Sequence, residues 1–353
     1  MRRAILFVAF LVCLILTFQS SPNLPKRYLL EEPPEVIKMQ IPEDNPLTVE
    51  GIALGRKLFY DPILSLDSSQ SCATCHQQHL AFTDGLAKSV GVLGQVGERS
   101  SISLVNVAYR YKGLFWDGRV ASLEEQSLHP VRNSKELAAN WPMIENRIRA
   151  KEAYVADFKE AFLIQEATEI DSFLIAKALA QFERTLNSFD AKFDRVQRGE
   201  AQFTASEQRG WTLFFDASLE VPHAECNHCH VDPLFTNLEF HNNGIQEVDN
   251  LEDFKDSGRG LLTSNKYDNG KFRVSSLRNI ALTAPYMHDG SIKTLEEVLD
   301  HYNSGGHFAE NVSPNVRPLQ LNKKDKADLL AFLNTLTDST LIHHPKFSNP
   351  FLQ

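Results

Sequence analysis

Two copies of one short pattern constrain this chain more than any other feature of its sequence. Residues 72–76 and residues 226–230 both read cysteine, two other residues, cysteine and histidine. Two cysteines at this spacing can each bond one vinyl group of the same porphyrin, and the following histidine then lies under the iron as its ligand. The pattern predicts two covalently attached c-type haems, held by Cys72, Cys75, His76, Cys226, Cys229 and His230.

Two other kinds of site also use paired cysteines. Four cysteine sulfurs can hold a structural zinc ion, but zinc does not require a histidine directly after each pair, and zinc pairs usually lie much closer in sequence. A redox dithiol would explain one pair better than two. Cys13 is the only cysteine outside the two patterns, so no disulfide is expected.

The length and charge exclude some classes of function. A chain of 353 residues suggests about two domains of roughly 150 residues each. The net charge of −9 at pH 7 provides no basic surface of the kind that binds nucleic acid. We therefore expect no nucleic-acid partner.

The N-terminus has the pattern of an export signal. Arg2 and Arg3 precede an apolar run over residues 4–16, and small and polar residues follow. The run is short for a membrane span, although an uncleaved anchor is the alternative. Cys13 follows a valine where a lipoprotein signal needs a small residue, so we interpret it as part of the signal. Because haem is attached on the outer face of the bacterial membrane, we expect a periplasmic protein.

The rest of the chain has mainly helical patterns. Residues 55–61 match residues 210–216, and each stretch predicts a helix with leucine and phenylalanine on one face shortly before a haem pattern. Residues 144–163, 171–198 and 323–336 carry apolar residues at steps of three and four. No long alternating strand pattern is present. We predict a mainly α fold with two cytochrome c-like domains, each carrying one covalent haem.

The expected domain boundaries follow from these patterns. Residues 1–21 are the signal peptide or short anchor, and the proline-rich residues 22–46 are a leader or linker. Residues 47–200 then form the N-terminal domain, and residues 201–353 form the C-terminal domain.

Three further stretches carry a family resemblance. They are Phe-Trp-Asp-Gly-Arg at residues 115–119, Leu-Arg-Asn at 277–279 and Thr-Ala-Pro-Tyr-Met-His-Asp-Gly at 283–290. With them, the chain resembles the bacterial di-haem cytochrome c peroxidases and the related MauG-type di-haem enzymes over about residues 47–340. The resemblance implies that the N-terminal haem meets peroxide and that the C-terminal haem accepts electrons.

The resemblance also implies roles for three residues near the first haem. Trp116 matches a tryptophan between the two haems, whose ring offers a path for electrons. Gln126 matches a glutamine of the peroxide pocket. Glu136 matches a glutamate that moves protons during O–O cleavage, which needs a carboxylate within reach of peroxide. Without the resemblance, Trp116 would be a buried interface aromatic and Glu136 one surface acid among many.

A calcium ion between the domains is a further implication of the resemblance. Thr283 and Pro285 match positions whose backbone carbonyls bind it. Ser100 stands where the family has an asparagine ligand, which weakens the match, although water can complete a calcium site. The expected cofactors are therefore two haem c groups and one calcium ion.

The chain departs from the conventional peroxidases at the first haem. Those enzymes block this haem with a histidine from the following loop, whereas residues 80–128 contain no histidine. We therefore predict that no protein ligand lies opposite His76, so that peroxide can bind without prior reduction.

A second departure concerns the other haem. The conventional ligand opposite its histidine is a methionine twelve residues after the glycine that ends residues 283–290. Counting twelve residues reaches Tyr302, the MauG-type arrangement. Met287 and His288 are rival ligands.

Three functions are compatible with these residues. The leading one is an exported peroxidase that reduces hydrogen peroxide to water with electrons from a small c-type cytochrome or copper protein. The second is an oxidase that oxidises tryptophan or tyrosine on a partner protein, which an open first haem and Tyr302 favour. The third is an electron carrier, which would need neither Gln126 nor Glu136. The oligomeric state is open, with a homodimer as one alternative.

Overall fold

The structure is a computed structural model that describes residues 24–352, so the predicted signal segment, residues 1–21, lies outside the described residues. Within that range the fold is mainly helical, as predicted. No helix of residues 24–352 is long and apolar enough to cross a membrane. The helices are α1 (Val49–Tyr60), α2 (Cys72–Cys75), α3 (Leu123–Arg132), α4 (Trp141–Arg149), α5 (Glu152–Phe162), α6 (Ser172–Glu183), α7 (Lys192–Gln197), α8 (Ala205–Phe214), α9 (Gly260–Thr263), α10 (Leu295–Ser304), α11 (Lys323–Asn334) and α12 (Ser339–His343), and one antiparallel pair joins β1 (Phe240–His241) to β2 (Phe272–Arg273).

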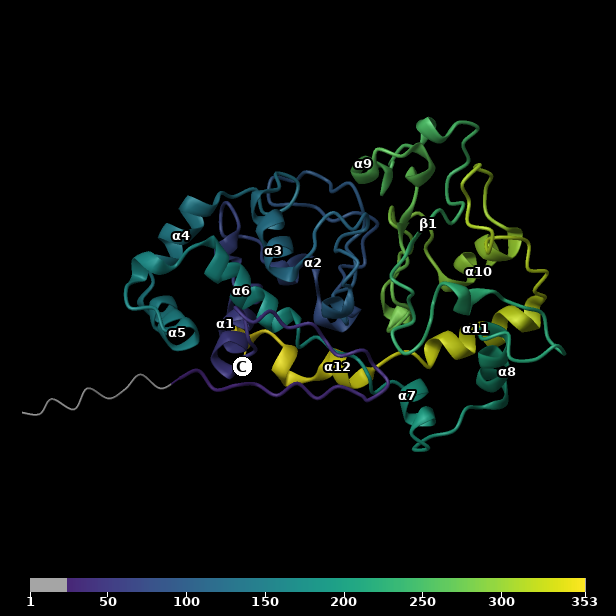
Figure 1. Ribbon diagram of the computed structural model, residues 1–353, viewed down its shortest axis with the longest axis horizontal. Helices are drawn as coiled ribbons and strands as arrows, with labels where there is room; N and C mark the ends of the chain where they lie inside the picture. Colours follow the sequence, from purple (N-terminus) through teal and green to yellow (C-terminus); the bar gives the residue numbers. More distant parts are fainter. Residues whose placement is uncertain (1–23, 353) are drawn as a thin grey trace, which may run out of the picture.

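The helices gather around two hydrophobic cores, which Figure 1 shows as two groups side by side. In the first core α1 and α3 both pack on α6, and Phe59 of α1 meets Phe182 of α6 with ring centroids 5.2 Å apart. In the second core α8 packs on α11, and Phe214 meets Phe332 at 5.1 Å. Each core lies beside one of the two haem patterns, since Cys72 packs against the first and Cys226 against the second.

Two predicted helices are each broken into two. Residues 144–163 belong to α4 and α5, and residues 171–198 belong to α6 and α7. After α6 ends at Glu183, Ser188 is held by distant residues. Its backbone N–H donates to the side chain of Asn106 at 2.9 Å, and its hydroxyl donates to Asp338 at 3.0 Å. In the segment between α6 and α7, these long-range hydrogen bonds stand where a continuous helix would have bonds between neighbouring turns.

Each copy of the duplicated helix has a glycine at the point where it crosses another helix at close range. A Cβ added at Gly55 of α1 would lie 1.9 Å from the carbonyl oxygen of Ala178, and one added at Gly210 of α8 would lie 2.0 Å from that of Asp328. Only hydrogen fits at either crossing. The sequence repeat therefore reflects the same helix-on-helix contact in both cores.

We expect Gly55→Ala and Gly210→Ala each to lower the free energy of unfolding by about 1–3 kcal/mol, the usual cost of overpacking a close contact. Gly97→Ala is the matched control, since a Cβ there would lie 3.4 Å from its nearest neighbour, the carbonyl oxygen of Ser89. Denaturant unfolding of the three variants measures the difference. Equal losses in all three would show that the crossings tolerate a methyl group.

Both ends of the described chain tie the two cores together. Val36 and Met39 of the predicted leader are buried against Tyr109 and Leu234. After the second core, α12 and the last residues return to the first core, where the C-terminus lies near α1 (Figure 1). The predicted domain of residues 201–353 thus includes a tail that packs on the first core.

Candidate active site

The two haem-attachment sites share one local construction. Nδ1 of His76 is 2.8 Å from the carbonyl oxygen of Phe82, and Nδ1 of His230 is 3.1 Å from that of Phe235. Both phenylalanines have positive φ, 60° and 52°. A histidine whose Nδ1–H donates to a carbonyl presents Nε2 as a ligand. Burial lowers the pKa of both histidines, that of His230 to about 4, which keeps them in the neutral form that binds metal.

The cysteines belong to two separate sites. Cys72 and Cys75 line one cavity, and Cys226 and Cys229 line another. Within residues 24–352 none of the four forms a disulfide. Four cysteines in two cavities cannot form one zinc site, so this alternative is excluded for the structure as described.

The first cavity brings the predicted peroxide-pocket residues together. It measures about 620 Å³ and is lined by Cys72, Cys75, His76, Gln126 and Glu136, among others. His76 is the only histidine in this lining, which also contains no methionine, tyrosine or lysine.

Local structure explains how Glu136 reaches this cavity. Helix α3 carries Gln126 and ends at Arg132, and the chain then turns so that the backbone N–H of Glu136 donates to the carbonyl oxygen of Asn133 at 3.0 Å. The side-chain amide of Asn133 also donates to Oε1 of Glu136 at 2.7 Å. Burial raises the pKa of Glu136, while Asn133 and the nearby Arg119 oppose that shift. A buried carboxyl group held this way is suited to accepting and returning a proton.

The sequence reasoning missed one residue of this cavity, Glu183. It is the last residue of α6 and lies one turn after Leu179, which also lines the cavity. The only sequence signal was an acid at the end of a mostly apolar helix, where it follows Phe182 directly.

The second cavity is larger, about 1370 Å³, and surrounds His230. Tyr302, Met287 and His288 all line it, so the structure brings every predicted rival ligand to the same cavity. The side-chain amide of Asn243 lies 3.5 Å from the Tyr302 hydroxyl oxygen and 3.1 Å from the Met287 sulfur. His288 stacks on Phe272 with ring centroids 3.5 Å apart. Which of the three binds iron stays a prediction.

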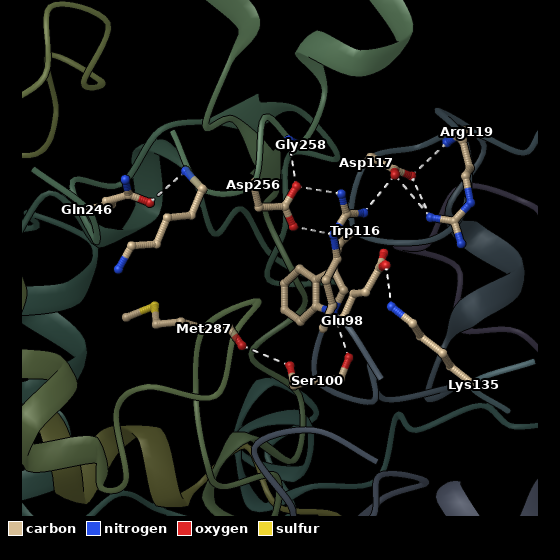
Figure 2. Close-up of polar contacts among 12 residues, drawn as sticks. Glu98, Ser100, Trp116, Asp117, Arg119, Lys135, Gln246, Asp256, Gly258 and Met287 are labelled. Atoms are coloured by element: carbon tan, nitrogen blue, oxygen red, sulfur yellow. Dashed lines mark hydrogen bonds and ion pairs between the residues drawn. The ribbon is translucent and has the colours of Figure 1, made fainter. Parts of the chain in front are cut away.

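Trp116 lies on the wall of the second cavity and faces a third cavity beside it. Its indole N–H donates to the carbonyl oxygen of Ser100 at 2.9 Å, and the Ser100 hydroxyl donates to the carbonyl oxygen of Met287 at 2.9 Å. Figure 2 shows Trp116 in the middle of this group. The tryptophan is thus fixed between a loop that follows the first haem pattern and the stretch that lines the second cavity.

Ion pairs next to Trp116 join the same two parts of the chain. Arg99 donates to Asp117 at 2.6 Å and to Asp256 at 2.6 and 2.8 Å, and Arg119 donates to Asp117 at 3.0 and 3.1 Å (Figure 2). Gly118, at φ +74°, leaves no room for a side chain because Phe240 packs against it. The stretch of residues 115–119 therefore forms part of the contact between the chain around the first haem pattern and the chain around the second.

The predicted calcium residues meet at the third cavity, about 520 Å³ in volume. Ser100, Thr283 and Pro285 all line it. Its wall contains hydroxyls and carbonyls but no carboxylate, and it includes the guanidinium of Arg110. These residues alone are a poor match to a site for a divalent cation. Calcium stays a prediction, and no step below depends on it.

Two buried arginines test whether the residues present fit haem. Arg110 and Arg273 are 6% and 3% exposed, and within residues 24–352 neither forms an ion pair. Arg110 donates to the carbonyl oxygen of Ser103, while Nη1 of Arg273 has no hydrogen-bond partner. Burial lowers the pKa of Arg110 to about 9 and of Arg273 to about 10. Buried cations without a counter-charge are costly, so this region is suited to anions such as haem propionates, and the residues fit the cofactor.

Comparisons with known proteins show the family of the chain. A family model described as di-haem cytochrome c peroxidase matches residues 49–202. The methylamine utilization protein MauG of Methylorubrum extorquens is 37% identical over 302 residues, which cover 84% of this chain and 80% of that protein. Cytochrome-c peroxidase IdrP1 of Denitromonas iodatirespirans is 35% identical over 332 residues, 86% of each chain.

A solved structure is similar along nearly its whole length. The crystal structure of a MauG-like protein associated with microbial copper homeostasis matches with a TM-score of 0.84 and 37% identity, covering 92% of this chain and 99% of that one. The resemblance expected from the sequence is confirmed. The chain belongs to the di-haem cytochrome c peroxidase family of oxidoreductases, which implies two haem c groups.

Proposed function

We propose that this chain is an exported, periplasmic di-haem peroxidase that reduces hydrogen peroxide to water with electrons from a small c-type cytochrome or copper protein. The observation that supports it is the first cavity. Gln126 and Glu136 line it together with His76, and the lining contains no other histidine and no methionine or tyrosine. An electron carrier would have no use for an acid–base group beside an accessible haem face.

The cofactor, when bound, supplies the redox chemistry. The residues of the cavity transfer protons and orient the peroxide. Glu136 takes a proton from one peroxide oxygen and returns it to the other, which makes the departing oxygen a water molecule. Asn133 holds the carboxyl in place for this transfer through its 2.7 Å hydrogen bond. The Gln126 amide orients peroxide. The apolar walls, including Leu104 and Val131, limit the entry of bulk water.

The electron path runs from the second cavity towards the first. Trp116 lies on the wall of the second cavity, and its hydrogen bond to Ser100 fixes the ring. The ion pairs of Arg99 hold the two halves around it. We propose that Trp116 carries electrons between the haems.

The proposal is tested by mixing the purified protein with peroxide and a reduced small cytochrome. Oxidation of two cytochromes per peroxide is the expected result. Intact mass, which should exceed the polypeptide by two haem masses, checks that both haems are attached. A protein with two haems that leaves the cytochrome reduced would contradict the peroxidase assignment.

A second candidate is oxidation of tryptophan or tyrosine residues on a partner protein. It is supported by the similarity to proteins named MauG and by Tyr302 in the cavity of His230. The same preparation, given peroxide and no cytochrome, would then change the mass of a co-expressed secreted protein instead. The two outcomes separate the candidates.

Substituting Tyr302→Phe should change the optical and paramagnetic spectra of the second haem and raise its reduction potential. The reason is that a phenolate ligand stabilises ferric iron, whereas a thioether favours ferrous iron. Met287→Leu is the matched control, because Met287 lines the same cavity and should leave the spectra unchanged. If Met287→Leu alone alters the spectra, methionine is the ligand and Tyr302 only lines the cavity.

A further inference from the structure

A second carboxyl group, that of Glu183, lies in the first cavity and has no role in the chemistry described above. Glu183 lines the cavity together with Glu136 and the haem-attachment residue Cys72. It is 6% exposed, so more than nine-tenths of it is buried. Its Oε2 atom has no hydrogen-bond partner within residues 24–352. A buried carboxyl without a partner is expensive to keep, and a purely structural position would be better filled by an apolar residue.

The surroundings of Glu183 keep it protonated. Arg184 follows it directly but pairs with Glu124 of α3, with hydrogen bonds of 2.7 and 2.9 Å. From α1 the cavity receives Phe59, which carries no charge, and from α2 it receives Cys72. Burial raises the pKa of Glu183 to about 8, Glu124 adds to the shift and Arg184 opposes it. The group therefore carries its proton at neutral pH and loses it as the pH rises through about 8.

The two carboxyl groups of the cavity differ in a way that suits different tasks. Glu136 accepts a hydrogen bond from Asn133, and Arg119 lies near enough to favour its charged form. Glu183 has no hydrogen-bond donor for its Oε2 atom within residues 24–352, and the neighbouring Arg184, which favours its charged form, is paired with Glu124. Glu136 is therefore the easier of the two to ionise, and Glu183 is the better proton store. Enzymes assign base and acid roles to paired carboxyls through such differences in environment.

We propose that Glu183 is the proton-supplying group of the first cavity, with Glu136 as the proton-transferring base. This inference rests on the proposed peroxidase function. Reduction of one peroxide breaks the O–O bond, takes one electron from each of two reduced small redox proteins, consumes two protons and releases two waters. Glu136 only moves a proton from one peroxide oxygen to the other, so both consumed protons come from elsewhere. Glu183 supplies one of them and solvent supplies the other, and Glu183 then regains its proton from solvent.

The test compares Glu183→Gln with Glu183→Asp in the holoenzyme. Glutamine keeps the size and polarity of the side chain but cannot exchange a proton, whereas aspartate can. Glu125→Gln is the control, because Glu125 is an exposed acid on α3, outside the cavity lining. Haem spectra confirm that each variant is folded and loaded.

The first readout needs no turnover. Infrared spectra of the ferric protein without peroxide should show a protonated-carboxyl band that disappears as the pH rises through about 8. Glu183→Gln should lack this band, Glu183→Asp should shift it, and Glu125→Gln should keep it. A band that persists unchanged in Glu183→Gln would overturn the proposal.

The second readout is the pH profile of peroxide turnover. The turnover rate of the wild type should fall above about pH 8. Glu183→Gln should be slower than wild type by roughly tenfold or more at neutral pH, which is less than the loss expected for a group that acts on peroxide directly. The rate of this variant should show no inflection near pH 8. Glu183→Asp should restore an inflection. A structural role would lower the rate at every pH and keep the wild-type profile, which would overturn the role of Glu183 alone. Wild type that consumes no peroxide would instead overturn the proposed function together with this role.

Discussion

Glu136→Gln should slow peroxide cleavage by roughly a hundredfold or more, the usual contribution of one positioned acid–base group. Glutamine retains an oxygen that can accept the 2.7 Å hydrogen bond from Asn133, so the local structure should be preserved while proton transfer is lost. Stopped-flow mixing of the variant with peroxide, followed through the haem spectrum, measures the change.

The control for this experiment is Glu125→Gln, which removes an exposed acid eleven residues earlier in the chain, outside the cavity lining. It should react at the wild-type rate. If Glu136→Gln also keeps the wild-type rate, then Glu183 or solvent performs the transfer, and the assignment of Glu136 as the base is wrong.

The fully ferric enzyme should react with peroxide without any reductive activation. The reason is that the cavity of His76 contains no second histidine and no methionine, tyrosine or lysine that could occupy the opposite face of the haem. The loop that blocks this face in conventional peroxidases lacks a histidine here, since residues 80–128 contain none. Peroxide should therefore change the haem spectrum of the ferric protein on the time scale of stopped-flow mixing.

Half-reduced enzyme provides the comparison. We expect the ferric and the half-reduced protein to react at similar rates, because the cavity lining offers no second side chain that would have to leave the iron first. A ferric protein that is inert, and that becomes reactive only after uptake of one electron, would show that a residue outside the described cavity lining closes the haem face.

The haem chemistry could be predicted because it depends on local spacing. Two cysteines and a histidine within five residues determine where a haem is attached, whatever the rest of the fold does. The mainly helical class also followed from local periodicity. The break between α6 and α7 did not, because the segment between them is held by bonds from Ser188 to Asn106 and Asp338, which lie far away in sequence.

Some residues of the candidate site could be predicted from the sequence, and others could not. Gln126 and Glu136 were predicted through the family resemblance, and the structure places both in the cavity of His76. Glu183 was not predicted, because an acid near the end of an apolar helix is ordinarily a solvated side chain, and only its packing shows that it is buried.

What the sequence determined by itself is therefore the pair of haem-attachment patterns, the helical class and the family. The tertiary structure decided which side chains share a cavity, because burial, hydrogen-bond partners and the pairing of buried charges depend on residues brought together from distant parts of the chain. Arg184 illustrates the reason. Its pairing with Glu124 of another helix, which no local pattern predicts, leaves the neighbouring Glu183 without a counter-charge in the first cavity.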